Sequence, residues 1–109
     1  MIPEKYVYSG YVLRVIDGDT VEAHIDLGLW VWVKNRHVRL LGINMPERRD
    51  PLGPSATQYL RDMCFLKMVT LQTTLDRSDK YGRLLATMWV GETNVNEAMK
   101  TWMEGQYGT

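Results

Sequence analysis

Four short clusters in this sequence combine residue types that could bind a cation, a phosphate or a nucleobase. The first is the run Asp17-Gly18-Asp19-Thr20, which lies between two segments rich in β-branched residues. Two carboxylates held close together at a turn could bind a hard cation through their oxygen atoms. Asp and Gly also favour turns for purely conformational reasons, and for this cluster taken alone an ordinary hairpin turn is the favoured interpretation.

The second cluster runs from Arg39 to Glu47 and has the sequence Arg-Leu-Leu-Gly-Ile-Asn-Met-Pro-Glu. Its arginine lies near the end of an expected strand, and its glutamate lies in the loop that follows. An arginine can neutralise the charge that develops on phosphoryl oxygens during phosphodiester cleavage. A glutamate can position or deprotonate the attacking water. The alternative is a surface ion pair, which is worth about 0–1 kcal/mol.

The third cluster is Asp79-Lys80-Tyr81-Gly82-Arg83, in the polar loop before the last expected strand. It places two cations and an aromatic ring within one short loop. Such a loop could clamp a terminal phosphate and stack a base. A solvated charged turn is the alternative interpretation.

The fourth cluster is Trp30-Val31-Trp32-Val33. On a strand the two tryptophans would share one face, since alternate side chains point the same way. They could stack nucleobases or contact a partner subunit. We expect them instead to be partly buried side chains of the sheet, because large aromatic residues are usually placed there.

Hydrophobic periodicity predicts the elements that must position these clusters. Turn residues interrupt runs of β-branched residues, and Pro54 suits the first turn of a helix whose apolar residues recur at helical spacing. Asn94 and Glu97 resemble a capping box, and Gly105 suits the end of that second helix. The expected strands cover residues of about 6–17, 19–27, 30–43, 68–75 and 84–90, and the expected helices begin near residues 54 and 94. This β-β-β-α-β-β-α order predicts a mainly β fold with two helices, a five-stranded OB-fold barrel.

Length and composition set limits on the class of protein. The 109 residues suit one domain, residues 1–109, and the net charge of zero disfavours a protein that coats nucleic acid through a basic excess. Cys64 is the only cysteine, which excludes an internal disulfide and a cysteine-rich zinc site. We see no signal peptide and no apolar segment long enough to span a bilayer, so we expect an intracellular protein without a membrane partner.

Three of these clusters, in this order, resemble the sequence motifs of the staphylococcal nuclease family. The matching runs are Ile16–Thr20, Val38–Glu47 and Asp79–Arg83, and Val95–Ala98 resembles the start of the helix after the fifth strand. The similarity extends over most of the chain.

The resemblance implies an OB-fold barrel and calcium-dependent cleavage of single-stranded or frayed DNA and RNA. Cleavage would break the 5′-side P–O bond and leave 3′-phosphates. By position, it implies that Asp19, Asn44 and the backbone carbonyl of Met45 bind Ca²⁺, that Arg39 and Arg83 bind the scissile phosphate, that Glu47 positions or activates water, and that Lys80 and Tyr81 contact a far phosphate and sugar.

Two departures from the family pattern leave alternatives open. Asn44 stands where the family usually has aspartate, so it brings one negative charge fewer to the cation. The tyrosine-bearing segment and last helix of well-known members have no counterpart, which we expect to leave apolar surface near Trp102 and Met103 and to favour a homodimer. The alternative functions are an OB-fold module that binds nucleic acid or protein without cleavage and, ranked last, a structural or assembly domain.

Overall fold

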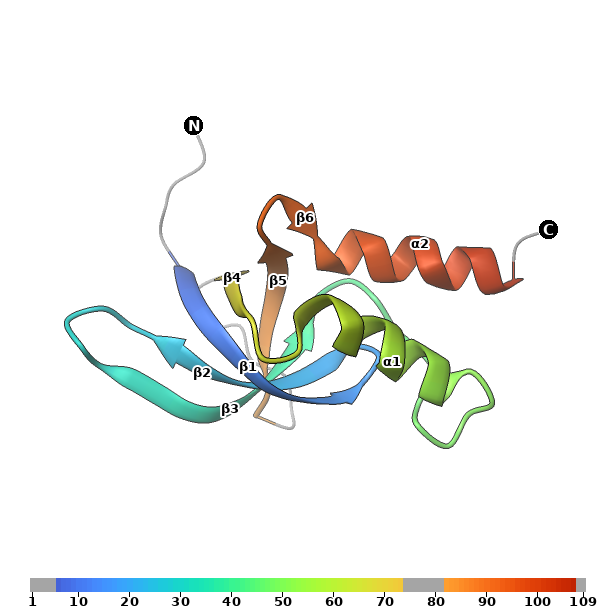
Figure 1. The fold of residues 1–109 in the computed structure, drawn as a ribbon, viewed down its shortest axis with the longest axis horizontal. Coiled ribbons are helices and arrows are strands. Elements are labelled where there is room, and N and C mark those ends of the chain that lie inside the picture. The colour runs from blue at the N-terminus through green and yellow to red at the C-terminus, as the bar shows by residue number, and fades with distance from the viewer. Residues whose placement is uncertain (1–5, 74–81, 108–109) are drawn as a thin grey trace.

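A sheet closed into a barrel forms the body of the protein. The computed structural model describes residues 6–73 and 82–107. Its sheet has the strand order β3-β2-β1-β4-β5-β6, and an additional pairing between β3 and β5 closes the barrel (Figure 1). The elements are β1 (Val7–Asp17), β2 (Thr20–Asp26), β3 (Trp32–Leu40), α1 (Gly53–Cys64), β4 (Met68–Gln72), β5 (Leu84–Val90), β6 (Thr93–Asn94) and α2 (Val95–Tyr107). The expected five-stranded OB-fold barrel with two helices is confirmed, and β6 is a two-residue addition that the sequence did not indicate.

The pairing of β3 with β5 brings distant parts of the sequence together. β1, β2 and β3 form an antiparallel meander, whereas β3 and β5 run parallel. Within the described residues, three residue pairs make this parallel seam, from Val38 opposite Leu84 to Leu40 opposite Ala86. Arg39 lies within the seam, and Arg83 directly precedes it. Closure of the barrel therefore places the second and third sequence clusters beside each other.

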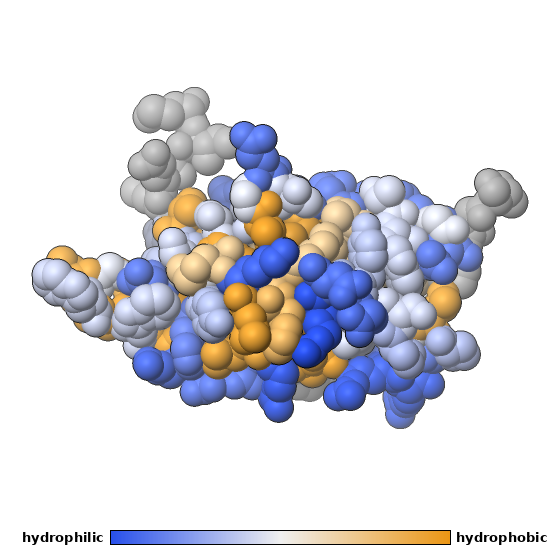
Figure 2. Space-filling model, viewed as in Figure 1, coloured by the Kyte–Doolittle hydropathy of each residue, from blue (hydrophilic) through white to orange (hydrophobic). Residues whose placement is uncertain are grey.

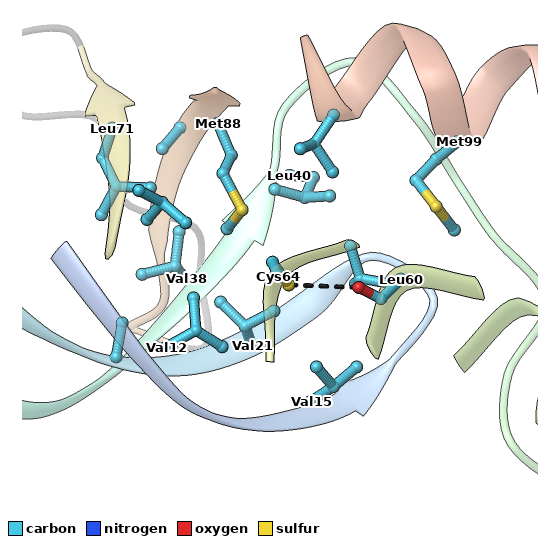
Figure 3. Close-up of a cluster of buried hydrophobic side chains, with 14 of the residues drawn as sticks. Val12, Val15, Val21, Val38, Leu40, Leu60, Cys64, Leu71, Met88 and Met99 are labelled. Carbon is cyan, nitrogen blue, oxygen red and sulfur yellow. Dashed lines mark hydrogen bonds between the residues drawn. The ribbon is translucent and has the colours of Figure 1, made fainter. Parts of the chain in front are cut away.

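The core lies inside the barrel and under the first helix. Alternate residues of the strands point inward, as a period of two requires, and the helix contributes Ala56, Leu60 and Cys64 with no exposed surface (Figure 3). The thiol of Cys64 donates a hydrogen bond to the carbonyl of Leu60 over 3.2 Å. Burial raises the pKa of Cys64 to about 12. This cysteine is therefore a packed core residue rather than a reactive one.

The second helix is anchored at its first turn. The side-chain oxygen of Asn94 accepts a hydrogen bond from the backbone N–H of Glu97 over 3.1 Å, as the capping prediction requires. The buried amide of Asn96 connects this helix to β5 and to the residue after β3. The helix continues through Gly105 to Tyr107, so the expected stop at Gly105 is wrong. Glycine inside a helix costs only about 1 kcal/mol relative to alanine, which is too little to end a helix by itself.

The two helices pack against each other through aromatic rings. Tyr59 of α1 stacks on Trp102 of α2, with ring centroids 5.7 Å apart. Trp102 and Met103 are half-buried and pack against the core. No helix within the described residues is long and apolar enough to cross a membrane.

The β2–β3 hairpin extends beyond the barrel (Figure 1). Trp30 is 95% exposed and lies in the turn, whereas Trp32 begins β3 and is 40% exposed. The expectation that both are partly buried residues on one strand face is therefore wrong. The physical reason is that β3 joins β5 only from Val38 onward, so the start of β3 has no barrel interior to face.

Candidate active site

The β1–β2 turn holds Asp19 against the end of β3. Asp19 is only 6% exposed. One carboxylate oxygen accepts the backbone N–H of Met45 over 2.9 Å, and the other accepts the hydroxyl of Thr20 over 3.0 Å. Its backbone carbonyl accepts the N–H of Leu40 over 2.7 Å. These bonds fix the carboxylate between the turn, the strand end and the loop after β3.

Arg39 lies directly beside this carboxylate. It pairs with Thr20 in the β2–β3 register, which places its side chain next to the turn. Its Nη2 lies 3.4 Å from Oδ2 of Asp19 and 3.5 Å from Oδ1 of Asn44, while Nη1 donates to the carbonyl of Leu40 over 2.8 Å. The structure thus brings together three residues that the resemblance assigned to one site: a carboxylate, an amide oxygen and a guanidinium.

Asp17 adds a second carboxyl group to the same turn. Its Oδ1 accepts the backbone N–H of Asp19 over 3.2 Å. Burial, together with the side-chain hydrogen bond and the charge of the neighbouring Asp19, raises the pKa of Asp17 to about 6. Two carboxyl groups this close favour a bound cation, since a positive charge offsets their mutual repulsion. The sequence pattern offered both carboxylates of this turn as cation ligands, whereas the family resemblance assigned that role to Asp19 alone.

The side chains around Asp19 fit a hard cation such as Ca²⁺. They offer carboxylate and amide oxygens, the ligands that Ca²⁺ takes in proteins. Both oxygens of Asp19 already accept hydrogen bonds, but a carboxylate has about four lone-pair positions, so capacity remains. Within the described ranges, no group of three or more His, Cys, Asp or Glu side chains forms a metal cluster. Backbone, water or substrate oxygens would therefore supply the other ligands.

Glu47 lies in the loop that follows β3, and its described contacts are with residues of that same loop and with the first residue of α1. Its side chain is 69% exposed and forms an ion pair with Arg49, with Oε2 3.0 Å from Nε. Its backbone carbonyl accepts the N–H of Asp50 over 2.9 Å. Gly53 packs so closely on that carbonyl that a Cβ would not fit. The backbone of Glu47 is thus fixed while its carboxylate faces solvent. Arg49 was missed as a partner, although its spacing from Glu47 was visible in the sequence.

The remaining expected site residues come from the segment before β5. Arg83 is half-buried and directly precedes Leu84, which pairs with Val38 across the seam. It therefore lies directly before the strand that pairs with the one carrying Arg39. Lys80 and Tyr81 lie outside the described residues.

Comparison with known proteins adds independent information. Residues 37–101 match the family model described as staphylococcal nuclease homologue, a range that includes Arg39, Asn44, Glu47 and Arg83. Protein ParB of Escherichia coli is 36% identical over 99 residues, which cover 83% of this chain and 51% of that protein. Thermonuclease of Staphylococcus hyicus is 31% identical over 94 residues, covering 81% of this chain and 52% of the thermonuclease.

A third relative is the micrococcal nuclease of Shigella flexneri. It is 30% identical over 120 residues, which cover 98% of this chain and 64% of the relative. The chain therefore spans about half to two-thirds of the length of the curated relatives that it matches.

Proposed function

Because the chain belongs to the staphylococcal nuclease homologue family, we propose that it is a calcium-dependent phosphodiesterase that cleaves single-stranded DNA or RNA. The observation that carries this proposal is the meeting of three groups at one point. The side-chain oxygens of Asp19 and Asn44 both lie beside the same nitrogen of Arg39. An anionic oxygen site next to a phosphate-binding cation is the arrangement that phosphodiester chemistry needs.

In the proposed reaction, Asp19, Asn44 and the backbone carbonyl of Met45 hold the cation. Bound Ca²⁺ supplies positive charge that draws the scissile phosphate into the site. Arg39 donates its N–H groups to the phosphoryl oxygens and stabilises the charge that grows there. Its bond to the carbonyl of Leu40 holds the guanidinium in place before substrate arrives. Arg83 serves as a second donor to the same phosphate.

Glu47 acts in this proposal as the general base. Its carboxylate takes a proton from a water molecule as the water oxygen forms a bond to phosphorus. The bond to the 5′ oxygen breaks, and this oxygen leaves with a proton from solvent, so a 3′-phosphate remains. The exposed position of the carboxylate makes it accessible to water and substrate, and its contact with Arg49 opens when it turns to the phosphate. Lys80 and Tyr81 are proposed to contact the neighbouring phosphate and sugar.

A second candidate function is favoured by Asn44. The amide oxygen of Asn44 can accept a hydrogen bond or coordinate a cation, but it carries no charge. The site therefore holds one carboxylate fewer than the family pattern, which has an aspartate at this position. A protein with this site and a net charge of zero could bind single strands without cleaving them. Such binding would weaken steeply as the salt concentration rises.

A cleavage assay separates the two candidates. The purified protein is incubated with labelled single-stranded DNA and RNA across a calcium titration, with a chelator control. The variants Glu47→Ala and Arg39→Ala are tested beside it, and circular dichroism checks that each is folded. We expect calcium-dependent cleavage that both variants lose. Cleavage by either folded variant at the wild-type rate would refute its assigned role, and binding without cleavage by the wild type would establish the binding module.

The proposed homodimer is tested separately by the mass of the protein in solution. A monomeric mass across the accessible concentration range would refute it.

A further inference from the structure

The tip of the β2–β3 hairpin carries an apolar surface that is exposed among the residues that the structure describes. We call it the tryptophan tip. Trp30 is 95% exposed and Leu29 is 89% exposed, although apolar side chains of this size are normally covered. Figure 2 shows hydrophobic residues reaching the end of this projecting hairpin, at the left of the view. The tryptophan tip consists of Leu27, Leu29, Trp30, Val31, Trp32 and Val33, all at least 36% exposed.

The backbone holds the tip in an unusual conformation. Gly28, Leu29 and Trp30 all have positive φ, at 84°, 55° and 62°. Bulky residues rarely adopt this region, and glycine or asparagine would fill such a turn with less strain. The turn is nevertheless closed by hydrogen bonds between Leu27 and Val31 and between Val31 and Gly28. A bulky tryptophan at this position is therefore unexplained by folding, and strained residues of this kind gather at functional sites.

β3 connects the tryptophan tip to the candidate active site. Between Trp32 and Arg39 the strand carries the exposed Lys34, and none of its residues is acidic. Arg36 pairs with the buried Ala23 and so lies on the inward side of the sheet with Val38. Seven residue steps at about 3.3 Å each separate Trp32 from Arg39 by about 23 Å. That length corresponds to about seven stacked nucleotides at 3.4 Å each, or to fewer in an extended strand. It falls within the 4–16 nucleotides that one OB fold typically binds.

The same strand is poorly suited to pair with another β-strand. Within the described residues, β3 pairs on its second side only through Val38–Leu40, which leaves its first half as an open edge. This edge contains a bulge, because Lys34 and Asn35 together lie opposite His24, and Asn35 has a φ of 54°. Bulges and edge lysines are devices that prevent strand addition. A second copy or an extended peptide is thus a poor occupant, whereas a phosphate backbone suits the exposed lysine.

We propose that the tryptophan tip and β3 form an extension of the substrate site that binds single-stranded polynucleotide. Bases of the strand stack on Trp30 and Trp32, the phosphate backbone follows β3 past Lys34, and the scissile phosphate lies at Arg39. This inference rests on the proposed nuclease function. Every base has a π-face, so stacking on tryptophan is tolerant of sequence. One stacked base contributes about 5- to 150-fold in affinity.

The test compares Trp30→Ala and Trp32→Ala with a matched control, Leu29→Ala. The control removes an equally exposed apolar side chain from the same turn but leaves both rings in place. Cleavage of a 30-nucleotide oligothymidylate and of a thymidine dinucleotide is measured for each. We expect the tryptophan variants to raise KM for the long strand by at least about 5-fold without changing kcat or dinucleotide cleavage. Leu29→Ala and Trp30→Phe should behave like the wild type.

Three outcomes would overturn the proposal while the nuclease function stands. The first is wild-type KM for the long strand in both tryptophan variants. The second is an equal loss in Leu29→Ala, which would indicate general apolar association. The third is an unchanged KM for the oligonucleotide in tryptophan variants that lose another kind of binding. Loss of binding to phosphatidylglycerol vesicles would identify a membrane as the occupant, and loss of self-association would identify a second copy of the chain. A wild type that neither binds nor cleaves either oligonucleotide would refute the proposed function and this extension together.

Discussion

Replacing Asn96 by alanine should be among the most destabilising single changes in this protein. Asn96 is 5% exposed and its amide makes three hydrogen bonds. Its oxygen accepts the N–H of Met88 over 3.0 Å, and its nitrogen donates to the carbonyls of Leu41 and Ala86 over 2.9 and 3.2 Å. One side chain thus ties α2 to β5 and to the end of β3, beside the seam that closes the barrel.

The three bonds do not contribute equally. The carbonyl of Ala86 also accepts the N–H of Leu41 over 2.8 Å, so it stays paired after the change. The N–H of Met88 is buried, and leaving a buried donor unpaired costs about 1–3 kcal/mol. With a smaller contribution from the carbonyl of Leu41, we expect Asn96→Ala to lower the free energy of unfolding by about 3 kcal/mol. That corresponds to a fall in Tm of about 12–24 °C for a domain of this size.

The control is Asn94→Ala, the same substitution two residues earlier, at the residue that caps this helix. Asn94 is half-buried and caps the helix through one hydrogen bond, which is worth about 1 kcal/mol. Urea unfolding gives the free energy of unfolding of each variant. Where the slope m, the dependence of that free energy on urea concentration, is unchanged, a shift in the midpoint reports a change in stability alone. If Asn96→Ala cost no more than Asn94→Ala, the claim that the buried amide joins the helix to the barrel would be refuted.

Four further changes test other parts of the structure. Gly18→Ala should lower stability by about 1–3 kcal/mol, because its Cβ would lie 2.9 Å from a side-chain atom of α1. Gly105→Ala should raise stability by about 0.5–1 kcal/mol, because alanine is more favourable than glycine inside a helix and no described atom lies within 4 Å of the new Cβ. Thermal melts of the Gly18 and Gly105 variants beside the wild type measure both changes. Asn44→Asp should lower the calcium concentration for half-maximal cleavage, and an unchanged midpoint in a calcium titration would count against Asn44 as a ligand. The hydrogen bond from Asn35 holds the pKa of Glu22 below its usual 4.5, so Glu22 contributes stability that is present above the unfolded pKa and lost as pH falls through the folded one. Glu22→Gln should therefore be less stable than the wild type near neutral pH and equal to it in acid, as urea unfolding at the two pH values would show.

Local sequence signals predicted the elements that depend on nearby residues. The turn at Asp17 and Gly18, the helix that begins near Pro54, and the capping of α2 by Asn94 were all visible as short patterns. Each depends on conformational preferences or bonds within a few residues. These features could be predicted because no distant part of the chain decides them.

Features set by distant contacts were beyond such patterns. The run around Trp30 and Trp32 has the composition of a buried strand, but the length of the β3–β5 seam decides where the barrel interior ends. Gly105 carries a stop signal, yet the preceding turns of α2 are already stabilised by packing on the core. In both cases tertiary structure overrode a local preference.

The candidate site also contains some features that could be expected from the sequence and others that could not. Asp19, Asn44 and Arg39 are separated by up to 25 positions in the sequence, so local patterns could not show that they lie close together. Their proximity was expected from the family resemblance alone. The raised pKa of Asp17 and the ion pair between Glu47 and Arg49 required atomic positions. Whether the assigned residues perform catalysis stays a prediction that the cleavage assay tests.

The shortness of the β3–β5 seam has a consequence for how the site forms during folding. The antiparallel meander of β1, β2 and β3 brings Asp19 and Arg39 together through contacts between neighbouring strands. Arg83 joins them only when the seam forms, and this closes a long loop of chain through three residue pairs. Long-range contacts of this kind form slowly, because the loop entropy is lost before the contacts stabilise it. A partly folded chain can therefore hold Asp19 beside Arg39 while Arg83 is still absent, and the proposed phosphate site is complete only when the barrel closes.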